Sequence, residues 1–287
     1  MMSRRIVLAG SLLAAPALVS LRAAADDAEP ALLQQLVALE RRHGGRLGVA
    51  ILNGTNSVSR RGDERFALCS TFKFLAAAFV LARVDRGEES LGRRVVYSKS
   101  DLVTYSPTTE KHVEGGLTMG EICEAAMVLS DNTAGNLLLD SFGGPTGLTS
   151  FARSLGDTVT RLDRRETELN EATPGDPRDT TTPLAMLNLL RKTVLGNTLS
   201  PSSREQLTAW LVANRTGDKR LRAGAPKGWR VGDKTGSGSN NATNDIAVIW
   251  PPGRAPILVT AYYAEAHATD DERNAVLAEV GRLATTL

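Results

Sequence analysis

Cysteine and histidine, the usual ligands of zinc, are scarce in this sequence. It has two cysteines and three histidines among 287 residues, and His43, His112 and His267 lie far apart along the chain. Zinc hydrolases hold their metal with histidines at short spacings such as H-E-x-x-H, so we expect neither a zinc enzyme nor any cofactor. The two cysteines, Cys69 and Cys123, could pair, but a core of this size does not need a disulfide.

A strong excess of charge of either sign is also absent. The net charge is only +2, and the charged residues are scattered rather than gathered in runs, so we expect no nucleic-acid partner. Aromatic residues make up 5% of the chain, yet 42% of the residues are hydrophobic and 23% are charged, as in an ordinary globular protein. The length suits one large domain or two interlocked ones.

The first 25 residues have the pattern of a signal peptide. Arg4 and Arg5 precede an apolar run from 6 to 21, and Ala23-Ala24-Ala25 forms a small-residue cleavage site. The run is short and contains Pro16, which argues against a membrane anchor. The sequence therefore predicts a periplasmic or secreted protein with no anchor after cleavage. Residues 3–8 resemble a twin-arginine signal, so both the general secretory route and the twin-arginine route stay open.

Strand patterns occur at both ends of the remaining chain, and helix patterns lie between them. Strands are predicted at 47–52, near Ser57 after an Asn53-Gly54 turn, and at 230–235, 245–250 and 257–263. Helices are predicted over 30–43, 70–83, 118–127 and 133–140, and from 183, 201 and 269 onward.

This order predicts a mixed fold of the α+β or α/β class. We expect a five-stranded antiparallel sheet built from both termini and flanked by helices, with an all-helical domain inserted into it. The predicted division is 26–66 and 213–287 for the sheet domain and 67–212 for the inserted domain. A cleft between the two is the natural place for an active site.

Ser70 and Lys73 form an S-x-x-K pair at the start of the predicted helix 70–83. A spacing of three stacks the two side chains, and the helix N-terminus favours a developing alkoxide. Because Phe72, Phe74 and Leu75 make this helix apolar, a charged lysine is costly to bury there. The pattern predicts a lysine with a depressed pKa that acts as base for a nucleophilic serine, or else a lysine that extends to the surface.

Two tripeptides further along the chain accompany the S-x-x-K motif. Ser130-Asp131-Asn132 lies between two predicted helices, and Lys234-Thr235-Gly236 ends a predicted strand. Alone, the first is ordinary turn chemistry and the second an exposed strand end. Together with S-x-x-K they stand in the order and approximate spacing that penicillin-recognising serine enzymes use.

From these motifs the chain resembles the class A β-lactamases over nearly its whole length after residue 25. The segment 164–170 matches the family's E-x-x-L-N motif, which begins an Ω-shaped loop below the active site. Asp179 stands where the family closes that loop with a salt bridge to Arg164. The resemblance implies a β-lactamase/transpeptidase-like fold and hydrolysis of the β-lactam amide of penicillins and cephalosporins, which confers resistance to these antibiotics.

The resemblance also implies the catalytic roles. Ser70 would be the nucleophile, and either Lys73 or Glu166 the base for acylation, a point that stays open. Glu166 with Asn170 would activate the water for deacylation, and Ser130 would pass a proton to the lactam nitrogen.

The same resemblance implies the substrate contacts. Asn132 would bind the amide of the substrate side chain. Lys234, Thr235 and Gly236 would meet the substrate carboxylate, and the backbone N–H groups of Ser70 and Ser237 would form the oxyanion hole. Tyr105 would stand at the mouth of the cleft.

Several positions depart from the family pattern. Asn244 stands where many members carry a carboxylate-binding arginine, and Arg220 is expected to replace it. Cys123 faces Ala77 instead of the cysteine found in some members, and Cys69 faces Gly238 instead of the partner cysteine of carbapenem-hydrolysing members. The family architecture therefore implies two free thiols. Gly238 argues against carbapenem hydrolysis, whereas the hydroxyl of Ser237 favours it.

Two rival functions share most of these residues. A D,D-peptidase or esterase on the same fold would use Ser70, Lys73, Ser130 and Lys234. A penicillin-sensing or penicillin-binding module would stop after acylation. Glu166 argues against both, and the sensor would usually carry a fused membrane segment. We expect a monomer whose only partners are β-lactam antibiotics.

Overall fold

The computed structural model describes residues 16–287, with side chains from Glu29 onward. Helix α1 spans Pro16–His43, so it begins upstream of the predicted start at Pro30 and contains that proline. Alanine is the strongest helix former and is frequent before Pro30, and a single proline removes one backbone donor without having to end a helix. Of the predicted signal peptide, residues 1–15 lie outside the described residues. The signal peptide stays a prediction.

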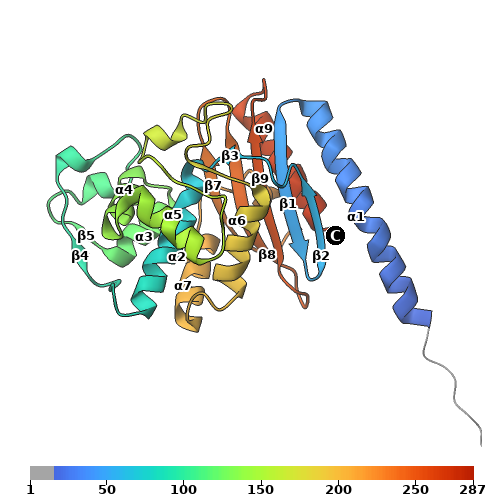
Figure 1. Ribbon diagram of the computed structural model, residues 1–287, viewed down its shortest axis with the longest axis horizontal. Coiled ribbons are helices and arrows are strands. Elements are labelled where there is room, and N and C mark those ends of the chain that lie inside the picture. Colours follow the sequence, from blue (N-terminus) through green and yellow to red (C-terminus); the bar gives the residue numbers. More distant parts are fainter. Residues whose placement is uncertain (1–15) are drawn as a thin grey trace, which may run out of the picture.

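The five-stranded sheet combines the two ends of the chain, as predicted (Figure 1). Its order is β2-β1-β9-β8-β7, and all neighbours are antiparallel. The strands are β1 Arg46–Asn53, β2 Asn56–Arg60, β7 Arg230–Ser237, β8 Thr243–Trp250 and β9 Ile257–Ala264. In β8 and β9 every residue but the last is buried, which requires cover on both faces of the sheet.

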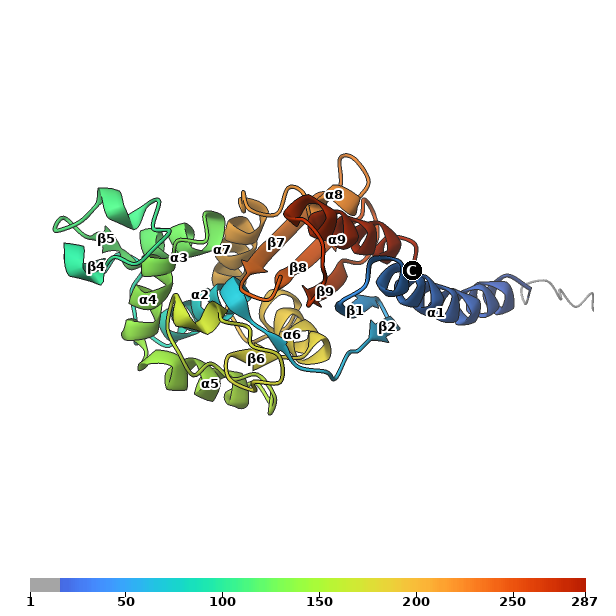
Figure 2. The ribbon, with the colours of Figure 1, turned by 90° about the horizontal axis from the view of Figure 1, so that it is seen from above.

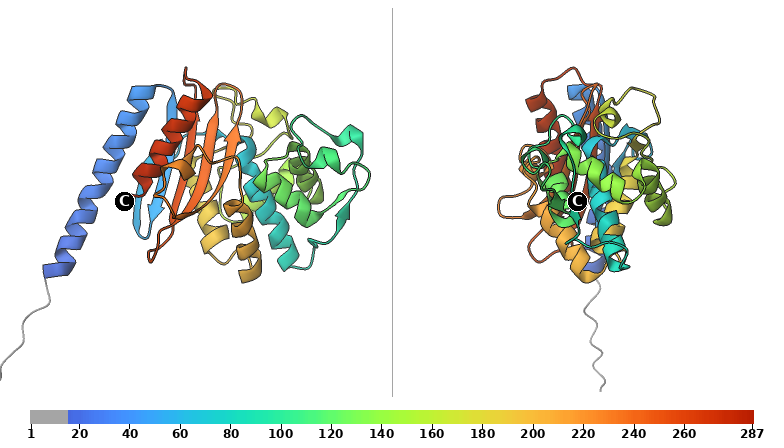
Figure 3. Two further views of the ribbon diagram at one scale, coloured as in Figure 1. Left: turned by 180° about the vertical axis from the view of Figure 1, so that it is seen from behind. Right: turned by 90° about the vertical axis from the view of Figure 1, so that its left-hand side faces the viewer.

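Helices supply that cover on both sides (Figures 2 and 3). One face packs against α1, α8 Leu221–Gly224 and α9 Asp270–Ala284 through a core that includes Leu36, Ile249 and Val280. The opposite face packs against the helical part through a second core that includes Phe72, Met186 and Tyr262. The fold is thus a mixed α and β structure in which the sheet lies between two helical layers.

The helical part surrounds α2 Phe72–Asp85, which is buried along most of its length. Around it lie α3 Met119–Val128, α4 Asn132–Ser141, α5 Gly144–Ser154, α6 Pro183–Leu190, α7 Pro201–Val212 and a π-helical turn Arg191–Leu195. Short 3₁₀ turns span Cys69–Thr71, Lys99–Asp101, Thr109–Lys111 and Glu168–Asn170. Two small antiparallel pairs join β3 Phe66–Ala67 to β6 Thr180–Thr181 and β4 Arg94–Val95 to β5 Leu117–Thr118.

The helix starts follow the capping residues in the sequence. Thr118 and Thr269 form capping boxes with Glu121 and Glu272, as predicted. The Thr260 hydroxyl on β9 donates to the Pro183 carbonyl at 2.8 Å, so α6 contacts the sheet directly although it lies within the predicted inserted domain. The division at 66 and 213 stays a prediction. No helix in the described part of the chain is long and apolar enough to cross a membrane.

Candidate active site

The nucleophile candidate lies at the junction of the sheet and the helical part. Ser70 sits in the 3₁₀ turn Cys69–Thr71, and α2 begins at Phe72, two residues later than predicted. Cys69 has φ +43°, a left-handed conformation that non-glycine residues rarely adopt. The chain therefore turns sharply just before Ser70 and only then enters the helix. Such uncommon backbone conformations concentrate at functional sites.

Lys73 is fully buried, so the alternative of a lysine reaching the surface is wrong. Its Nζ lies 3.0 Å from Ser70 Oγ, 2.7 Å from Asn132 Oδ1, 2.8 Å from the Ser130 carbonyl and 2.8 Å from Glu166 Oε1. Burial lowers the pKa of Lys73, and the charge of Glu166 opposes that shift. A lysine in this position can exchange protons with both the serine and the glutamate.

Glu166 lies on the Ω loop, which we define as residues 164–179. Both backbone groups of Glu166 are hydrogen-bonded by the Asn136 side chain, at 2.9 and 3.0 Å. Its carboxylate accepts from Asn170 Nδ2 at 2.5 Å and lies 3.4 Å from Ser70 Oγ. Arg164 Nε donates to Asp179 Oδ2 at 2.6 Å, which is the closing salt bridge that the family resemblance implied.

The Ser130-Asp131-Asn132 segment forms a tight corner between α3 and α4. Ser130 has φ +60°, and the Asp131 side chain caps α4 by accepting from Ala134 N at 2.8 Å. This fixes Asn132 at the first turn of α4, where its Nδ2 donates to the Thr104 carbonyl at 2.8 Å. The segment is a turn, as its composition predicts, and it also directs Ser130 and Asn132 toward Lys73.

Lys234 completes this polar centre from the sheet. It lies inside β7, is fully buried, and its Nζ donates to Ser130 Oγ at 2.9 Å. Its K-T-G segment is therefore not an exposed strand end. Burial and the nearby Lys73 lower the pKa of Lys234 well below its ordinary value. Ser130 thus contacts both lysines, Lys234 through its hydroxyl and Lys73 through its carbonyl oxygen.

Arg220 approaches β7 from the segment before α8. Its guanidinium donates to the carbonyls of Gly236 and Asn244 at 2.8 and 2.7 Å and to Ser237 Oγ at 2.7 Å. Asn274 on α9 accepts from its Nε at 2.9 Å. Four neutral acceptors hold Arg220 in place, and within the described part of the chain it forms no salt bridge with a carboxylate. It is not a solvated surface arginine.

Asn244 does not face this cleft. Its Nδ2 donates to the Ala67 carbonyl at 2.9 Å. Alternate residues of a strand point to opposite faces of the sheet, so Asn244 and Thr243 on β8 face opposite ways. The neighbouring Thr243 side chain accepts from Arg273 instead, at 2.9 Å. The expectation that Asn244 occupies the position of a carboxylate-binding arginine is therefore wrong in orientation, whereas Arg220 does reach the cleft.

These residues surround a cavity of about 300 Å³. Tyr105 stands at its mouth with 57% of its surface exposed and a backbone φ of +64°. Nine predicted residues line it, and Lys73, Glu166 and Lys234 lie buried behind: the lining set is Ser70, Tyr105, Ser130, Asn132, Asn170, Arg220, Thr235, Gly236 and Ser237. Thr216 also lines the cavity, 2.5 Å from Thr235 Oγ1, and the sequence analysis missed it. It belongs to no motif, so only the fold identifies it.

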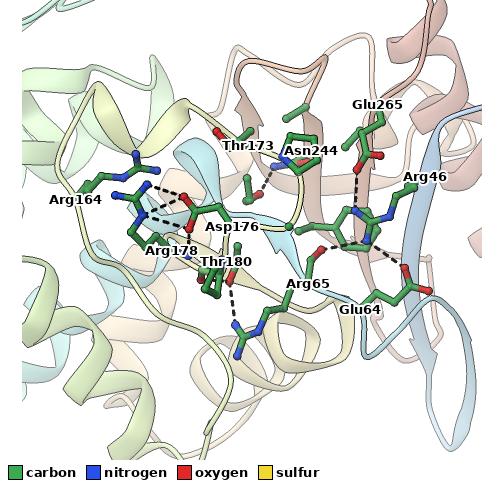
Figure 4. Close-up of a pocket in the computed structure, with 18 residues that line it drawn as sticks. Arg46, Glu64, Arg65, Arg164, Thr173, Asp176, Arg178, Thr180, Asn244 and Glu265 are labelled. Atoms are coloured by element: carbon green, nitrogen blue, oxygen red, sulfur yellow. Dashed lines mark hydrogen bonds and ion pairs between the residues drawn. The ribbon is translucent and has the colours of Figure 1, made fainter.

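A larger cavity, of about 470 Å³, lies behind the Ω loop and holds none of the predicted catalytic groups (Figure 4). Three of its four arginines pair with carboxylates: Arg46 with Glu64 and Glu265, Arg164 with Glu171 and Asp179, and Arg178 with Asp176. The fourth, Arg65, donates to the Val159 carbonyl and to Thr180 Oγ1. These ion pairs form within the loop and within the end of the sheet, so the charged groups satisfy one another and do not converge on a ligand. The smaller cavity, with its perturbed lysines, is the better candidate for chemistry.

Both cysteines are free, as the family architecture implied. Each is buried, Cys69 behind Ser70 and Cys123 in α3. Gly238 does lie next to Cys69, since a Cβ built at Gly238 would be 2.7 Å from the Cys69 sulfur. The chain thus has the contact but not the second thiol of a disulfide at this position.

The chain is similar to known proteins over most of its length. Residues 31–286 match the model of the beta-lactamase enzyme family. The chain is 51% identical to beta-lactamase CTX-M-97 of Escherichia coli over 88% of this chain and 87% of the relative, and 49% identical to beta-lactamase OXY-1 of Klebsiella oxytoca over 93% and 91%.

Solved structures are similar over the same region. An ancestral (GNCA) class A beta-lactamase is 66% identical with a TM-score of 0.87, covering 88% of this chain and 98% of that one. The putative class A beta-lactamase PenP from Rhodopseudomonas palustris is 61% identical with a TM-score of 0.88, covering 89% and 98%. With its serine, lysines and glutamate in one cleft, the chain belongs to the class A β-lactamases.

Proposed function

We propose that the protein hydrolyses the β-lactam amide of penicillins and cephalosporins through an acyl-enzyme on Ser70. One observation supports this best: Ser70 Oγ lies within 3.0 Å of a buried lysine and 3.4 Å of a buried glutamate, in the same cleft. A nucleophile needs an adjacent base, and deacylation needs a second base placed to activate water. Both are present at one serine.

For acylation we favour Lys73 as the immediate proton acceptor. Its Nζ is closer to Ser70 Oγ than either oxygen of Glu166 is, and burial favours its neutral form. Its contact with Glu166, at 2.8 Å, gives the lysine a route to lose its own proton first. The proton taken from Ser70 then passes to Ser130 and on to the departing lactam nitrogen, and Lys234 Nζ, which donates to Ser130 Oγ at 2.9 Å, holds that hydroxyl in place.

For deacylation we propose Glu166 as the base. Asn170 donates one hydrogen bond to it and has a buried Oδ1 that finds no partner among the described residues. A buried acceptor without a partner is costly, so this atom is suited to bind an attacking water beside Glu166. The backbone N–H groups of Ser70 and Ser237 would stabilise the tetrahedral oxyanion in both steps.

The remaining groups would hold the substrate. Arg220 and Thr235 line the cavity and would offer a guanidinium and a hydroxyl to the substrate carboxylate, with Lys234 buried behind them. Guanidinium groups match carboxylates in geometry. Asn132 would bind the side-chain amide, and the exposed ring of Tyr105 would cover the substrate ring. Gly236 lines the cavity, and a Cβ there would lie 3.0 Å from the Leu68 carbonyl and 3.2 Å from Cys69 Cβ, so a glycine lets β7 pack closely against the turn that carries Ser70.

The test compares the wild type with Ser70→Ala on a penicillin and on a peptide ending in D-alanyl-D-alanine. We expect rapid opening of the penicillin by the wild type, none by the variant, and no turnover of the peptide. Peptide turnover without penicillin hydrolysis would establish the D,D-peptidase alternative. A penicillin adduct on Ser70 that never clears would establish the sensor alternative.

We further propose that the protein acts as an exported monomer that confers β-lactam resistance. The signal-peptide pattern of residues 1–25 supports export, and the low net charge argues against a polyanionic partner. Resistance of a susceptible bacterium that expresses the full chain, compared with one that expresses residues 26–287 alone, tests export. We expect protection from the full chain only.

A further inference from the structure

A buried acid lies directly behind the groups proposed to bind the substrate carboxylate. Asp245 on β8 is fully buried and is paired across the sheet with Thr235 on β7. Thr235 lines the catalytic cavity. Because residues paired across neighbouring strands project to the same face of a sheet, Asp245 lies on the face that carries Thr235.

Asp245 is also bonded to the segment that presents Arg220. Its Oδ2 accepts a hydrogen bond from the backbone N–H of Leu221, the residue after Arg220, at 3.1 Å. The preceding residue on β8, Asn244, accepts from the Arg220 guanidinium through its carbonyl at 2.7 Å. The backbone next to Arg220 and the end of its side chain are therefore both fixed to one short stretch of β8.

A second acid holds the same segment at a different point. The Arg222 guanidinium donates to Asp233 on β7. Leu221 is buried, and a Cβ at Gly281 of α9 would lie 2.2 Å from its carbonyl, so the segment also packs closely against α9. Loss of the Asp245 bond alone should therefore leave the segment attached to the fold but free to shift.

Stability alone does not explain an acid at position 245. Within the described part of the chain Asp245 has no ion-pair partner, and its Oδ1 is buried without a hydrogen-bond partner, which is costly. The only hydrogen bond that its side chain accepts among these residues comes from Leu221 N. Burial, together with the charge of Asp233, raises the pKa of Asp245 and favours its neutral form, so a neutral amide is a close substitute.

We propose that Asp245 is a positioning residue for the carboxylate-binding part of the cleft: by accepting the hydrogen bond from Leu221 N, it fixes the backbone that carries Arg220 and so sets the approach of the guanidinium to the substrate carboxylate. This rests on the proposed function, in which Arg220 and Thr235 bind that carboxylate. Asp245 does not line the cavity, so it acts through Arg220.

The test measures kcat and KM for a penicillin in Asp245→Ala, which removes the acceptor, and in Asp245→Asn, which keeps one. Asp245→Ala should raise KM by about 2- to 10-fold, the range for one net hydrogen bond. Its kcat should stay within about twofold of the wild type, because the catalytic serine, lysine and glutamate keep their contacts. Asp245→Asn should stay within about twofold of the wild type in both constants, since its amide oxygen can accept from Leu221 N.

A double variant separates positioning from a general loss of stability. If Asp245 acts through Arg220, Asp245→Ala should add nothing to the KM increase that Arg220→Ala causes, whereas independent effects would add in full. The matched control is Asp157→Ala. Asp157 is also a buried acid with one oxygen without a partner, and it accepts from two backbone N–H groups, but it does not line the catalytic cavity. This control should lower Tm and leave KM within about twofold.

Three results would each overturn the proposal: an unchanged KM in Asp245→Ala, an equal increase in Asp245→Asn, or full additivity in the double variant. If Asp245→Ala does not fold, Asp245→Val replaces it, since valine suits a buried strand and cannot accept a hydrogen bond. Exchange of the Leu221 amide hydrogen should quicken in the Ala or Val variant and not in Asp245→Asn, and equal exchange in all of them would overturn the contact itself. A wild type that opens no penicillin would instead count against the proposed function, and the exchange measurement would still test the contact.

Discussion

The two walls of the catalytic cleft are held by different forces. On one wall, Ser70, Lys73 and Lys234 lie between the helical part and the sheet, and none is more than 8% exposed. On the other, the Ω loop has an exposed stretch and is held by an ion pair at its base and polar bonds to Asn136 and the hairpin between β7 and β8. Packing fixes the acylation groups, whereas directional bonds that can be removed one at a time fix the deacylation groups.

This difference suggests that acylation and deacylation can be separated by mutation. Packed cores have little freedom to adjust, so changes on the Ser70 wall should harm stability and both chemical steps. A loop held by hydrogen bonds can open locally while the core stays folded. The predictions below test this contrast, beginning with the largest expected effect.

Removal of Glu166 should separate the two steps most clearly. In Glu166→Ala the deacylating water loses its base, and we expect turnover to fall by about 10²- to 10⁴-fold, the usual contribution of general base catalysis. Lys73 still contacts Ser70, so a penicillin adduct should accumulate and be visible by intact-protein mass spectrometry. Rapid return to unmodified protein with turnover preserved would contradict the role of Glu166.

On the wall formed by the Ω loop, substitutions at the base of the loop should reduce stability the most. Asp179 is fully buried and accepts from two backbone N–H groups and from Arg164. Asp179→Ala leaves these donors unpaired, and we expect the loop to lose about 3–5 kcal/mol of local stability, as for a broken buried ion pair. Limited proteolysis should then cut within 164–179 while far-UV circular dichroism stays unchanged. Simultaneous loss of the whole fold would show that the loop and core unfold together.

Arg220 tests the substrate anchor on the packed wall. Arg220→Ala should raise KM for penicillins by about 10-fold or more, because a hydrogen bond to a charged group contributes about 1.5–3 kcal/mol. Steady-state kinetics on several penicillins and cephalosporins would measure this. Arg86→Ala, which removes an exposed arginine paired with Glu88, serves as the control. Equal kinetics in the two variants would mean that Arg220 does not meet the substrate.

A buried acid on β8, Asp245, should make the packed wall sensitive to pH. Burial, together with the charge of Asp233, raises the pKa of Asp245 well above its ordinary value. A raised pKa in the folded state stabilises the fold at low pH, and this stabilisation is lost as the pH rises through that pKa. Asp245→Asn cannot ionise, so its Tm should fall less than that of the wild type between pH 4 and pH 9. The difference should be a few degrees, at about 2–4 °C per kcal/mol for a chain of this size. Parallel Tm curves would show that Asp245 does not titrate there.

The cysteines should give the smallest effect. Burial raises the pKa of the Cys69 thiol to about 12 and also raises that of Cys123. We expect no labelling of the native protein by a thiol reagent and labelling of both residues under denaturing, non-reducing conditions. Addition of a reductant should leave Tm unchanged. Labelling that requires a reductant would contradict the two free thiols.

Local patterns in the sequence were sufficient for the elements of the fold. The short apolar runs in 245–250 and 257–263, the Asn53-Gly54 turn and the Thr–Glu capping boxes act over a few residues, so the strands and helix starts followed from them. Ser70 and Lys73 are one helical turn apart, and their contact is also local. The predicted start of the first helix at Pro30 was wrong, because α1 continues through that proline.

Other features depend on the tertiary structure alone. The contacts between Lys73 and Glu166 and between Ser130 and Lys234 join residues 93 and 104 positions apart, and only the packing of the Ω loop and β7 against α2 brings them together. Arg220 reaches the cleft across the end of β7, whereas the Asn244 side chain turns toward Ala67, and this depends on how the strands pack. Thr216 lines the cavity for the same reason, since no sequence motif contains it. The sequence by itself determined which chemical groups the protein has, because short-range patterns identify them. The fold decided which groups touch, because burial and strand register act between segments distant along the chain.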